Sequence, residues 1–434
     1  MAIRDWLIRA DPGCPAIVAE GRALTYAALS QRVDAAAAAL AARGVGEGDR
    51  VALALPAGAD FAVTLHACWR IGAAAMPVDG RLGAAERAAQ ERTARLVVAS
   101  PLPACDPLDP SRGVAEHDED AVATVIHTSG TTGAPRAVEL TFANWAANAE
   151  GSAVALGRDP AERWLCALPL SHVGGLSILI RSAVYGTTAL IHPRFDAGAG
   201  AAALMSGEAT LVSVVPTMLA RLLDAGLRAP PRLRCALIGG GPLDAALAAR
   251  ARAADVPVAQ TYGLTEACSQ VTTSRIGEPG TAGRPLPGTR VVVGADGEIL
   301  VRGPTVAPGA VAPDGFLHTG DLGALDDLGR LVVRARKSET IVTGGDNVAP
   351  AEVEAVLRTH PDVLDAAVFG SPDARWGERV VAAVVARPGH APDGTAVREH
   401  AAARLAGFKV PKEVELVPEL PRTASGKVRR AALR

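Results

Sequence analysis

The sequence of 434 residues lacks the features that mark secreted, membrane-spanning and nucleic-acid-binding proteins. Its six cysteines stand singly, without a C-x-x-C pair, so neither a disulfide framework nor a zinc site is expected. No apolar run approaches the roughly 18–20 residues that span a bilayer, and the N-terminal residues show no signal peptide. The net charge of −2 provides no basic surface for nucleic acid. We therefore expect a soluble, cytoplasmic protein with small-molecule partners, and a homo-oligomer is left open.

Aromatic side chains are also scarce, at 3% of the chain, although 49% of the residues are hydrophobic. Alanine and valine dominate the hydrophobic residues, so the core must be assembled from many small side chains. The chain is long enough for roughly two or three folding units.

Strand and helix patterns alternate through the first part of the chain. Helices are expected at 27–43 and 61–72. Strands are expected at 50–55, 94–99, 124–128, 211–215, 235–238 and 258–261. This alternation predicts an α/β fold of parallel sheets covered by helices. Between 283 and 333 short strands are separated by Gly and Asp turns, which indicates a small antiparallel β unit.

The C-terminal part differs in its pattern of helices and strands, and it has the length of a small separate domain. Helices are expected at 347–357 and 395–405, and strands at 366–369 and 380–386. We predict a large N-terminal domain over residues 1–336 and a small, mobile α+β domain over residues 337–434, with the hinge near Ser338.

One loop has the composition of a phosphate-binding site. It follows an apolar strand, and its candidate ligand-binding residues are Thr128, Ser129, Gly130, Thr131, Thr132, Gly133 and Arg136. Glycines let the backbone approach a ligand, hydroxyl and N–H groups can donate to phosphate oxygens, and Arg136 adds a cation. The loop is not a Walker A motif, because no Gly-Lys-Ser/Thr follows. A polar surface turn would have the same composition.

This loop and several later motifs, in the same order, resemble the adenylate-forming superfamily of acyl-CoA synthetases, peptide-synthetase adenylation domains and luciferases. The later motifs are Gly239-Gly240-Gly241-Pro242, Tyr262-Gly263-Leu264-Thr265-Glu266, His318-Thr319-Gly320-Asp321, Arg336-Lys337-Ser338-Glu339 and the segment 421–427, which ends in Lys427. The resemblance extends over nearly the whole chain. It implies that the protein uses ATP, Mg²⁺ and coenzyme A to join a carboxylic acid to the coenzyme.

The resemblance also implies how the nucleotide is held. The loop along the adenine would consist of Gly239, Gly240 and Gly241. Tyr262, which precedes Gly263, would stack on the base, and Thr265 would contact a phosphate. The ribose hydroxyls would be bound by Asp321 and Arg336. In isolation, Asp321 could equally be an ordinary turn residue.

The catalytic candidates are Lys427, His172 and Glu266. A carboxylate that attacks an anionic α-phosphate needs cations to offset the repulsion. By resemblance, Lys427 supplies one of them and Glu266 holds Mg²⁺, although each alone could be a surface residue or a helix N-terminal acid. Rotation about Ser338 would then bring in Gly344 and Gly345, where coenzyme A enters.

The sequence departs from the common family pattern at two positions. Arg136 ends the phosphate loop where lysine is common, so the charge is kept but the shape differs. Ser338 stands in the hinge where many relatives have an acid or a lysine.

The acid substrate is indicated by two segments. The run from His172, which would gate the acyl pocket, through Gly174 and Gly175 to Arg181 resembles o-succinylbenzoate–CoA ligases of menaquinone synthesis, as does Ser269-Gln270 after the glutamate. That acid has a second carboxylate, which Arg181 and Ser269 could bind. Arg181 could also be a surface arginine lying along a helix. Another aryl- or fatty-acid ligase, a stand-alone adenylation domain and a non-catalytic nucleotide-binding relative are the alternatives.

Overall fold

The computed structural model describes residues 2–103, 105–108, 113–129, 135–422 and 428–433. Its backbone divides into two compact units. The first contains Met1–Val291 and Val301–Leu317, and the second contains Val292–Leu300 and His318–Arg434. The hinge boundary expected after Arg336 stays a prediction.

The first unit contains a nine-stranded sheet in the order β16-β15-β14-β13-β12-β10-β11-β2-β3. Strands β2 and β10 to β14 run parallel, and β3, β15 and β16 pair antiparallel with their neighbours. Strands β11, β12 and β13 are buried at every residue, as is typical of sheets covered on both faces. The strands are β2 (Pro15–Ala19), β3 (Arg22–Thr25), β10 (Arg163–Cys166), β11 (Thr188–Ile191), β12 (Leu211–Val214), β13 (Cys235–Ile238), β14 (Val258–Leu264), β15 (Ser269–Thr273) and β16 (Arg284–Pro285).

A second sheet of the same unit has the strand order β6-β4-β5-β8-β9. Strands β4, β5, β6 and β8 are parallel, and β9 forms an antiparallel hairpin with β8. Strand β1 (Ala2–Arg4) pairs separately with β7 (Glu116–Asp118). The five strands are β4 (Arg50–Leu53), β5 (Ala74–Pro77), β6 (Leu96–Val98), β8 (Val122–Ser129) and β9 (Pro135–Thr141). The expected parallel α/β architecture is thereby confirmed.

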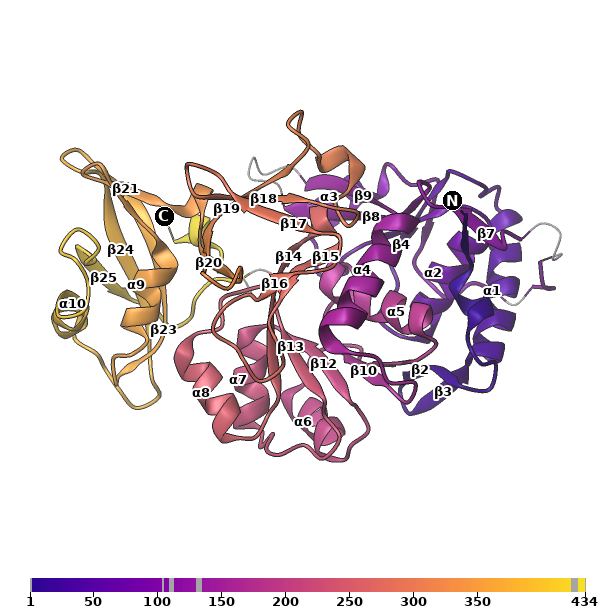
Figure 1. Ribbon diagram of the computed structural model, residues 1–434, viewed down its shortest axis with the longest axis horizontal. Helices are drawn as coiled ribbons and strands as arrows, with labels where there is room; N and C mark the ends of the chain where they lie inside the picture. The colour runs from indigo at the N-terminus through magenta and orange to yellow at the C-terminus, as the bar shows by residue number, and fades with distance from the viewer. Residues whose placement is uncertain (1, 104, 109–112, 130–134, 423–427, 434) are drawn as a thin grey trace. The chain divides into compact units, whose positions relative to one another are not determined.

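Helices cover both sheets. In Figure 1, α6, α7 and α8 lie beside β12 and β13, with which they share one apolar core. Helix α4 begins with a capping box, in which the Thr141 and Asn144 side chains bond to each other's backbone N–H groups. The helices are α1 (Tyr26–Ala41), α2 (Ala59–Arg70), α3 (Ala84–Glu91), α4 (Phe142–Leu156), α5 (Val173–Tyr185), α6 (Ala197–Met205), α7 (Pro216–Asp224) and α8 (Ala245–Ala253).

A four-stranded sheet lies along the chain where the small β unit was expected. Its order is β17-β18-β19-β20, and β19 and β20 are antiparallel. The strands are β17 (Arg290–Val293), β18 (Glu298–Arg302), β19 (Leu317–Leu325) and β20 (Leu331–Arg336).

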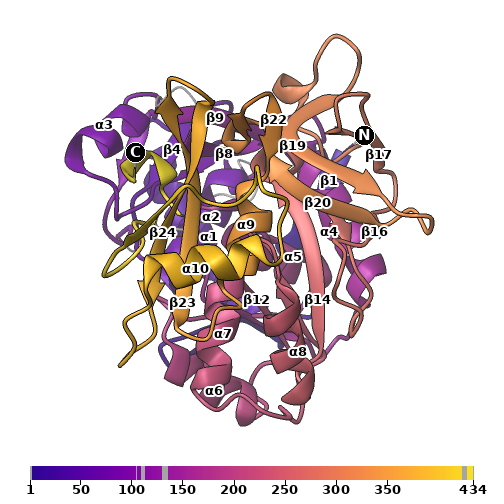
Figure 2. The same cartoon turned by 90° about the vertical axis from the view of Figure 1, so that its left-hand side faces the viewer.

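The remainder of the second unit is a sheet in the order β22-β21-β24-β23, with β25 beside β24. Helices α9 (Pro350–Leu357) and α10 (Gly394–Ala402) share an apolar core with β23 and β24 (Figure 2). The helix predicted from residue 347 begins only at Pro350, because 346–348 pair with β21 instead. The strands are β21 (Ile341–Thr343), β22 (Asp346–Val348), β23 (Val363–Asp373), β24 (Gly377–Ala386) and β25 (Glu413–Leu416).

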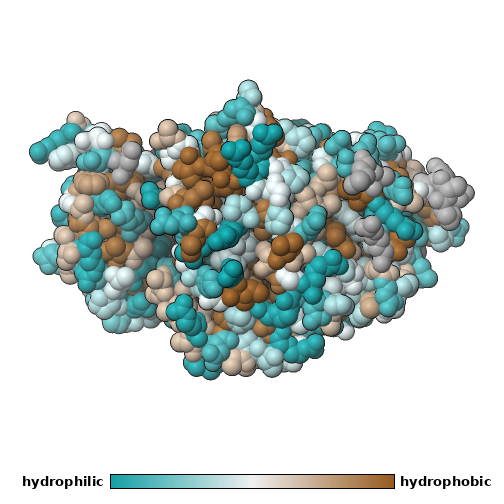
Figure 3. Space-filling view, in the orientation of Figure 1, coloured by the Kyte–Doolittle hydropathy of each residue, from teal (hydrophilic) through white to brown (hydrophobic). Residues whose placement is uncertain are grey.

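The surface has a mixed character. Hydrophilic and hydrophobic residues are interspersed on the face drawn in Figure 3, in keeping with 21% charged residues. Within the described ranges, every helix is too short or too polar to cross a membrane.

Candidate active site

Two predicted nucleotide segments meet at the carboxyl ends of β13 and β14. Gly239 directly follows β13, and a Cβ atom at this position would lie 3.0 Å from Cγ2 of Thr261 in the neighbouring strand. A Cβ atom on Gly263 would overlap the carbonyl oxygen of Ser269. The backbone therefore requires glycine at Gly263. Ligands of parallel sheets bind at this edge, so the geometry suits the predicted positions of Gly239, Gly240, Gly241 and Tyr262.

The base of the predicted phosphate loop is the β8–β9 hairpin, in which Thr128 pairs with Arg136. The Thr128 hydroxyl donates to the Arg136 carbonyl over 3.4 Å, and the Arg136 guanidinium donates to the Gly309 carbonyl over 3.4 Å. Strand β9 contacts the short 3-10 helix η3 (Thr265–Ala267), which carries Thr265 and Glu266. The structure thus brings this hairpin and the predicted metal ligand together. The predicted residues Gly130, Thr131, Thr132 and Gly133 lie outside the described residues, and Ser129 ends β8.

Glu266 lies in the first turn of η3, and its carbonyl accepts the Ala307 N–H over 2.8 Å. Its carboxylate makes no hydrogen bond or ion pair with another described side chain. No group of three or more metal-binding side chains occurs in the part of the chain that the structure describes. A single available carboxylate fits Mg²⁺, which proteins commonly hold through one or two carboxylates and the phosphates of a substrate.

His172 lies at the N-cap of α5, and its Nε2 atom is 3.7 Å from an oxygen of Asp79. Arg81 donates to both oxygens of Asp79, over 2.8 Å from Nε and 2.7 Å from Nη2. Burial acts to raise the pKa of Asp79, but the bonds from Arg81 outweigh it and hold this pKa below its usual range. Sequence reasoning missed Asp79. The available signal was an acid placed just beyond the carboxyl end of β5.

Arg181 is fully enclosed in the first unit, with 1% of its surface exposed. Its Nε and Nη2 atoms donate to Oδ1 of Asn148 over 3.1 and 2.6 Å, and its guanidinium lies 5.5 Å from the centre of the Trp164 ring. Burial lowers the pKa of Arg181 to about 10. Among the described residues, no acidic side chain forms an ion pair with it. The alternative of a surface arginine is therefore wrong.

The glycines of α5 differ in how much room they have. A Cβ atom on Gly175 would overlap the Pro169 carbonyl oxygen and lie 2.8 Å from that of Leu168. On Gly174 it would meet only Leu168, at 3.6 Å. Gly175 is thus needed for the close approach of α5 to the segment that precedes it.

The connection after Glu266 has an unusual backbone. Cys268 and Ser269 have φ values of 50° and 88°, a region that favours glycine. Cys268 is buried, and its thiol has a raised pKa because of that burial, which the nearby Arg181 opposes. The Gln270 amide donates to the Thr273 hydroxyl over 2.8 Å. The structure therefore places Cys268 near Arg181, and it gives Gln270 a partner within β15.

In the second unit, Asp321 and Arg336 are paired across β19 and β20, and Arg336 Nη1 donates to Asp321 over 3.0 Å. Gly320 has φ of 70°, and its N–H donates to the Glu298 carboxylate over 2.8 Å. The two predicted ribose-binding residues are thus brought together.

The predicted hinge and the predicted coenzyme A segment come directly after Arg336 in the chain. Ser338 is exposed in the 3-10 helix η5 (Lys337–Glu339). Gly344 and Gly345 connect β21 to β22 with φ of 60° and 90°, as in a two-residue hairpin turn. The Gly344 N–H donates to the Trp376 carbonyl over 2.8 Å.

Lys427 lies outside the described residues, but the chain on either side of segment 423–427 is held in place. Arg422 and Val428 form an antiparallel bridge, and the Arg429 N–H donates to the Pro421 carbonyl over 2.7 Å.

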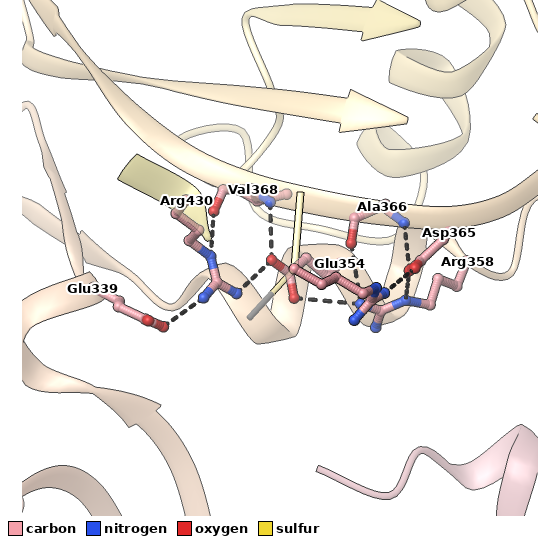
Figure 4. A network of polar contacts seen from close by, with 8 residues as sticks. Glu339, Glu354, Arg358, Asp365, Ala366, Val368 and Arg430 are labelled. Carbon is pink, nitrogen blue, oxygen red and sulfur yellow. Dashed lines mark hydrogen bonds and ion pairs between the residues drawn. The ribbon is translucent and has the colours of Figure 1, made fainter. Parts of the chain in front are cut away.

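Just beyond this segment, Arg430 joins three parts of the second unit (Figure 4). Its guanidinium donates to Glu339 over 2.6 Å, to Glu354 over 2.6 Å and to the Val368 carbonyl over 3.0 Å. Glu354, whose side chain is 6% exposed, also accepts the Val368 N–H over 2.9 Å. The Arg430 network therefore links the chain after Lys427 to α9, β23 and the residue that follows Ser338.

Comparison with known proteins identifies the family of the chain. Residues 5–100 and 98–310 match the family described as AMP-binding enzyme, and residues 352–427 match the AMP-binding enzyme C-terminal domain. The 2-succinylbenzoate–CoA ligase of Bacillus licheniformis is 37% identical over 97% of this chain and 97% of its own. The o-succinylbenzoate CoA synthetase of Bacillus subtilis, in complex with the acyl-adenylate intermediate, is 34% identical and superimposes with a TM-score of 0.92 over 100% of this chain and 98% of its own. A structure of that enzyme with ATP and magnesium ion also gives 0.92, at 34% identity and over 100% of both chains. The chain therefore belongs to the AMP-binding enzyme family, the adenylate-forming superfamily that its motifs indicate.

Proposed function

We propose that this protein is an AMP-forming 2-succinylbenzoate–CoA ligase of menaquinone synthesis. The observation that carries the substrate assignment is the buried guanidinium of Arg181, which has no acidic partner among the described residues. A buried cation without a counter-ion favours an anionic ligand. The ring carboxylate of 2-succinylbenzoate supplies such a group, while its succinyl carboxylate remains free to react. The similarity to 2-succinylbenzoate–CoA ligases supports the same assignment.

In the first step, an oxygen of the succinyl carboxylate attacks the α-phosphorus of ATP, and the bond to the β-phosphate oxygen breaks. His172 borders the acyl group, and the 128–136 loop and Thr265 orient the phosphates. Lys427 offsets the negative charge on the α-phosphate. Asp321 and Arg336 bind the ribose, and Glu266 would hold Mg²⁺, which supplies charge neutralisation to the phosphates when bound. The products are the acyl-adenylate and pyrophosphate.

In the second step, the sulfur of coenzyme A attacks the acyl carbonyl, the acyl–phosphate bond breaks, and AMP leaves as the thiol proton passes to solvent. We assign residues 337–434 to a domain that rotates about Ser338 between the two steps and brings in Gly344 and Gly345. A disulfide designed to lock this domain in the adenylation arrangement should leave pyrophosphate release intact and abolish thioester formation until it is reduced. Unimpaired thioester formation by the locked protein would contradict the rotation.

The substrate is tested by mass detection of thioesters formed with ATP, Mg²⁺, coenzyme A and a panel of acids. The panel contains 2-succinylbenzoate, benzoate, short and long fatty acids and amino acids. We expect 2-succinylbenzoyl-CoA to dominate, and Arg181→Met to lower its kcat/KM by about 100-fold or more. Arg163→Met, which removes a partly exposed guanidinium at the start of β10, is the matched control.

A dominant product from another acid would keep the reaction class and refute the substrate. An adenylate without any thioester would favour a stand-alone adenylation domain. ATP binding without release of pyrophosphate would favour a non-catalytic relative.

A further inference from the structure

Helix α4 presents a polar stripe to the interior, formed by Asn144, Asn148 and Ser152, one helical turn apart. Asn144 has a structural role, because its amide donates to the carbonyls of Pro304 and Val306 over 2.8 and 3.1 Å. Asn148 differs. It is fully buried, and its oxygen accepts two bonds from Arg181 on α5.

The orientation of the Asn148 amide follows from chemistry. A guanidinium can only donate, so the amide oxygen must face it, and the NH₂ group must point away. That NH₂ nitrogen is buried and has no hydrogen-bond partner among the described residues. Buried donors nearly always have a partner, so an ordered water or an acceptor on a ligand is expected at this nitrogen.

The partner of the Arg181 guanidinium is the uncharged amide of Asn148, and this absence of charge matters. An aspartate here would form a bidentate ion pair with Arg181 and cancel its charge. The amide oxygen instead fixes the Nε and Nη2 edge of the guanidinium while the full positive charge remains. Arg181 has a neutral acceptor on one edge and the face of Trp164 nearby, so an anion has no internal carboxylate to displace.

We propose that Asn148 is a positioning residue that determines specificity for acids with a second negative charge. It holds Arg181 in one orientation without neutralising it, and thereby makes the acyl site select dianionic substrates. This inference rests on the proposed function, because it takes Arg181 as the group that receives the second carboxylate.

The experiment compares two acids that differ only in the ring carboxylate, 2-succinylbenzoate and 4-oxo-4-phenylbutanoate. Adenylation of each is followed by ATP–pyrophosphate exchange, so that KM and kcat are obtained separately for the wild type, Asn148→Asp and Asn148→Ser. In Asn148→Asp we expect KM for 2-succinylbenzoate to rise about 100-fold, with kcat within about 3-fold and kcat/KM for the monoacid nearly unchanged. Asn148→Ser keeps a neutral oxygen, and it should retain most of the preference for the diacid.

Equal losses for both acids in Asn148→Asp would point to a structural role and overturn the inference. So would a preference for the diacid that survives unchanged. If Asn148→Asp does not fold, Asn148→Leu decides, because it removes the oxygen that orients Arg181: a loss of the diacid preference of about 10-fold or more, with kcat/KM for the monoacid nearly unchanged, supports the inference, and a parallel loss on both acids or an unchanged preference overturns it. A wild-type protein without any preference for 2-succinylbenzoate would instead refute the proposed function, before any variant is measured.

Discussion

Replacing Arg430 by methionine should destabilise the second unit, because three contacts of the guanidinium are lost. The contact with Glu339, which is 41% exposed, contributes little, at most about 0.5 kcal/mol. Glu354 is buried and loses a charge-assisted bond of about 1.5–3 kcal/mol, although it keeps the Val368 N–H. The Val368 carbonyl is left buried without its donor, at a further cost of about 1 kcal/mol or more. Removing a partly buried cation offsets some of this, so we expect a net loss of about 3 kcal/mol.

The assay is hydrogen exchange of the intact protein, read by mass spectrometry on peptides from α9 and β23. Such peptides report local opening even in a chain of two units, for which a single unfolding midpoint is not well defined. A loss of about 3 kcal/mol corresponds to exchange about 150-fold faster. Arg404→Met is the control, since that exposed arginine makes, among the described residues, a single surface hydrogen bond, to the His400 carbonyl. It should change exchange by about 2-fold or less.

A change below about 3-fold in Arg430→Met would refute the reasoning, because it would mean that the buried ion pair contributes no net stability. A double-mutant cycle with Glu354→Gln then apportions the loss of stability. If that loss comes from the contact with Glu354, Glu354→Gln should destabilise the Arg430→Met variant much less than it destabilises the wild type.

Further predictions concern the first unit. Burial lowers the pKa of His66 from its ordinary value of 6.5 to about 4. Between these two pH values the unfolded state binds more protons than the native state, so the free energy of unfolding should fall by about 3 kcal/mol as the pH drops from 6.5 to 4. Urea titrations should show a weaker pH dependence in His66→Gln, and an unchanged dependence would contradict the assignment. Gly175→Ala should reduce the rate of adenylation and unfold at a lower urea concentration than the wild type, because its Cβ overlaps the Pro169 carbonyl oxygen. Gly174→Ala is the control and should be tolerated. Wild-type behaviour of Gly175→Ala would show that α5 can shift to make room. Asp79→Ala should raise KM for the acid several-fold by releasing His172, and an unchanged KM would show that His172 needs no such support.

The motifs locate the site in the chain, and the assignment of Gly263 to nucleotide binding stays a prediction. The structure adds that no Cβ atom fits at Gly263, because the Ser269 carbonyl oxygen lies against it, a contact that the sequence alone does not reveal. The start of α9 was misplaced by three residues, because the pairing of 346–348 with β21 is a contact that periodicity does not reveal.

The orientation of Arg181 could not be predicted for a different reason. Helix α5 is buried on every side from Gly175 to Ala183, so the usual division into a buried apolar face and an exposed polar face does not indicate which way the Arg181 side chain points. Asn148 lies 33 residues away in the chain, and only the packing of α4 against α5 brings it to Arg181. Asp79 reaches His172 in the same way, from the end of another strand.

The left-handed backbone of Cys268 and Ser269 has a consequence for engineering. A non-glycine residue in this conformation costs about 1 kcal/mol or more, and two stand in succession next to the predicted metal ligand. Glycine would relieve that cost, yet the chain carries a thiol and a hydroxyl there. Selection for heat tolerance alone should therefore favour glycine at Ser269, and the resulting variants should be more stable and less selective among acid substrates.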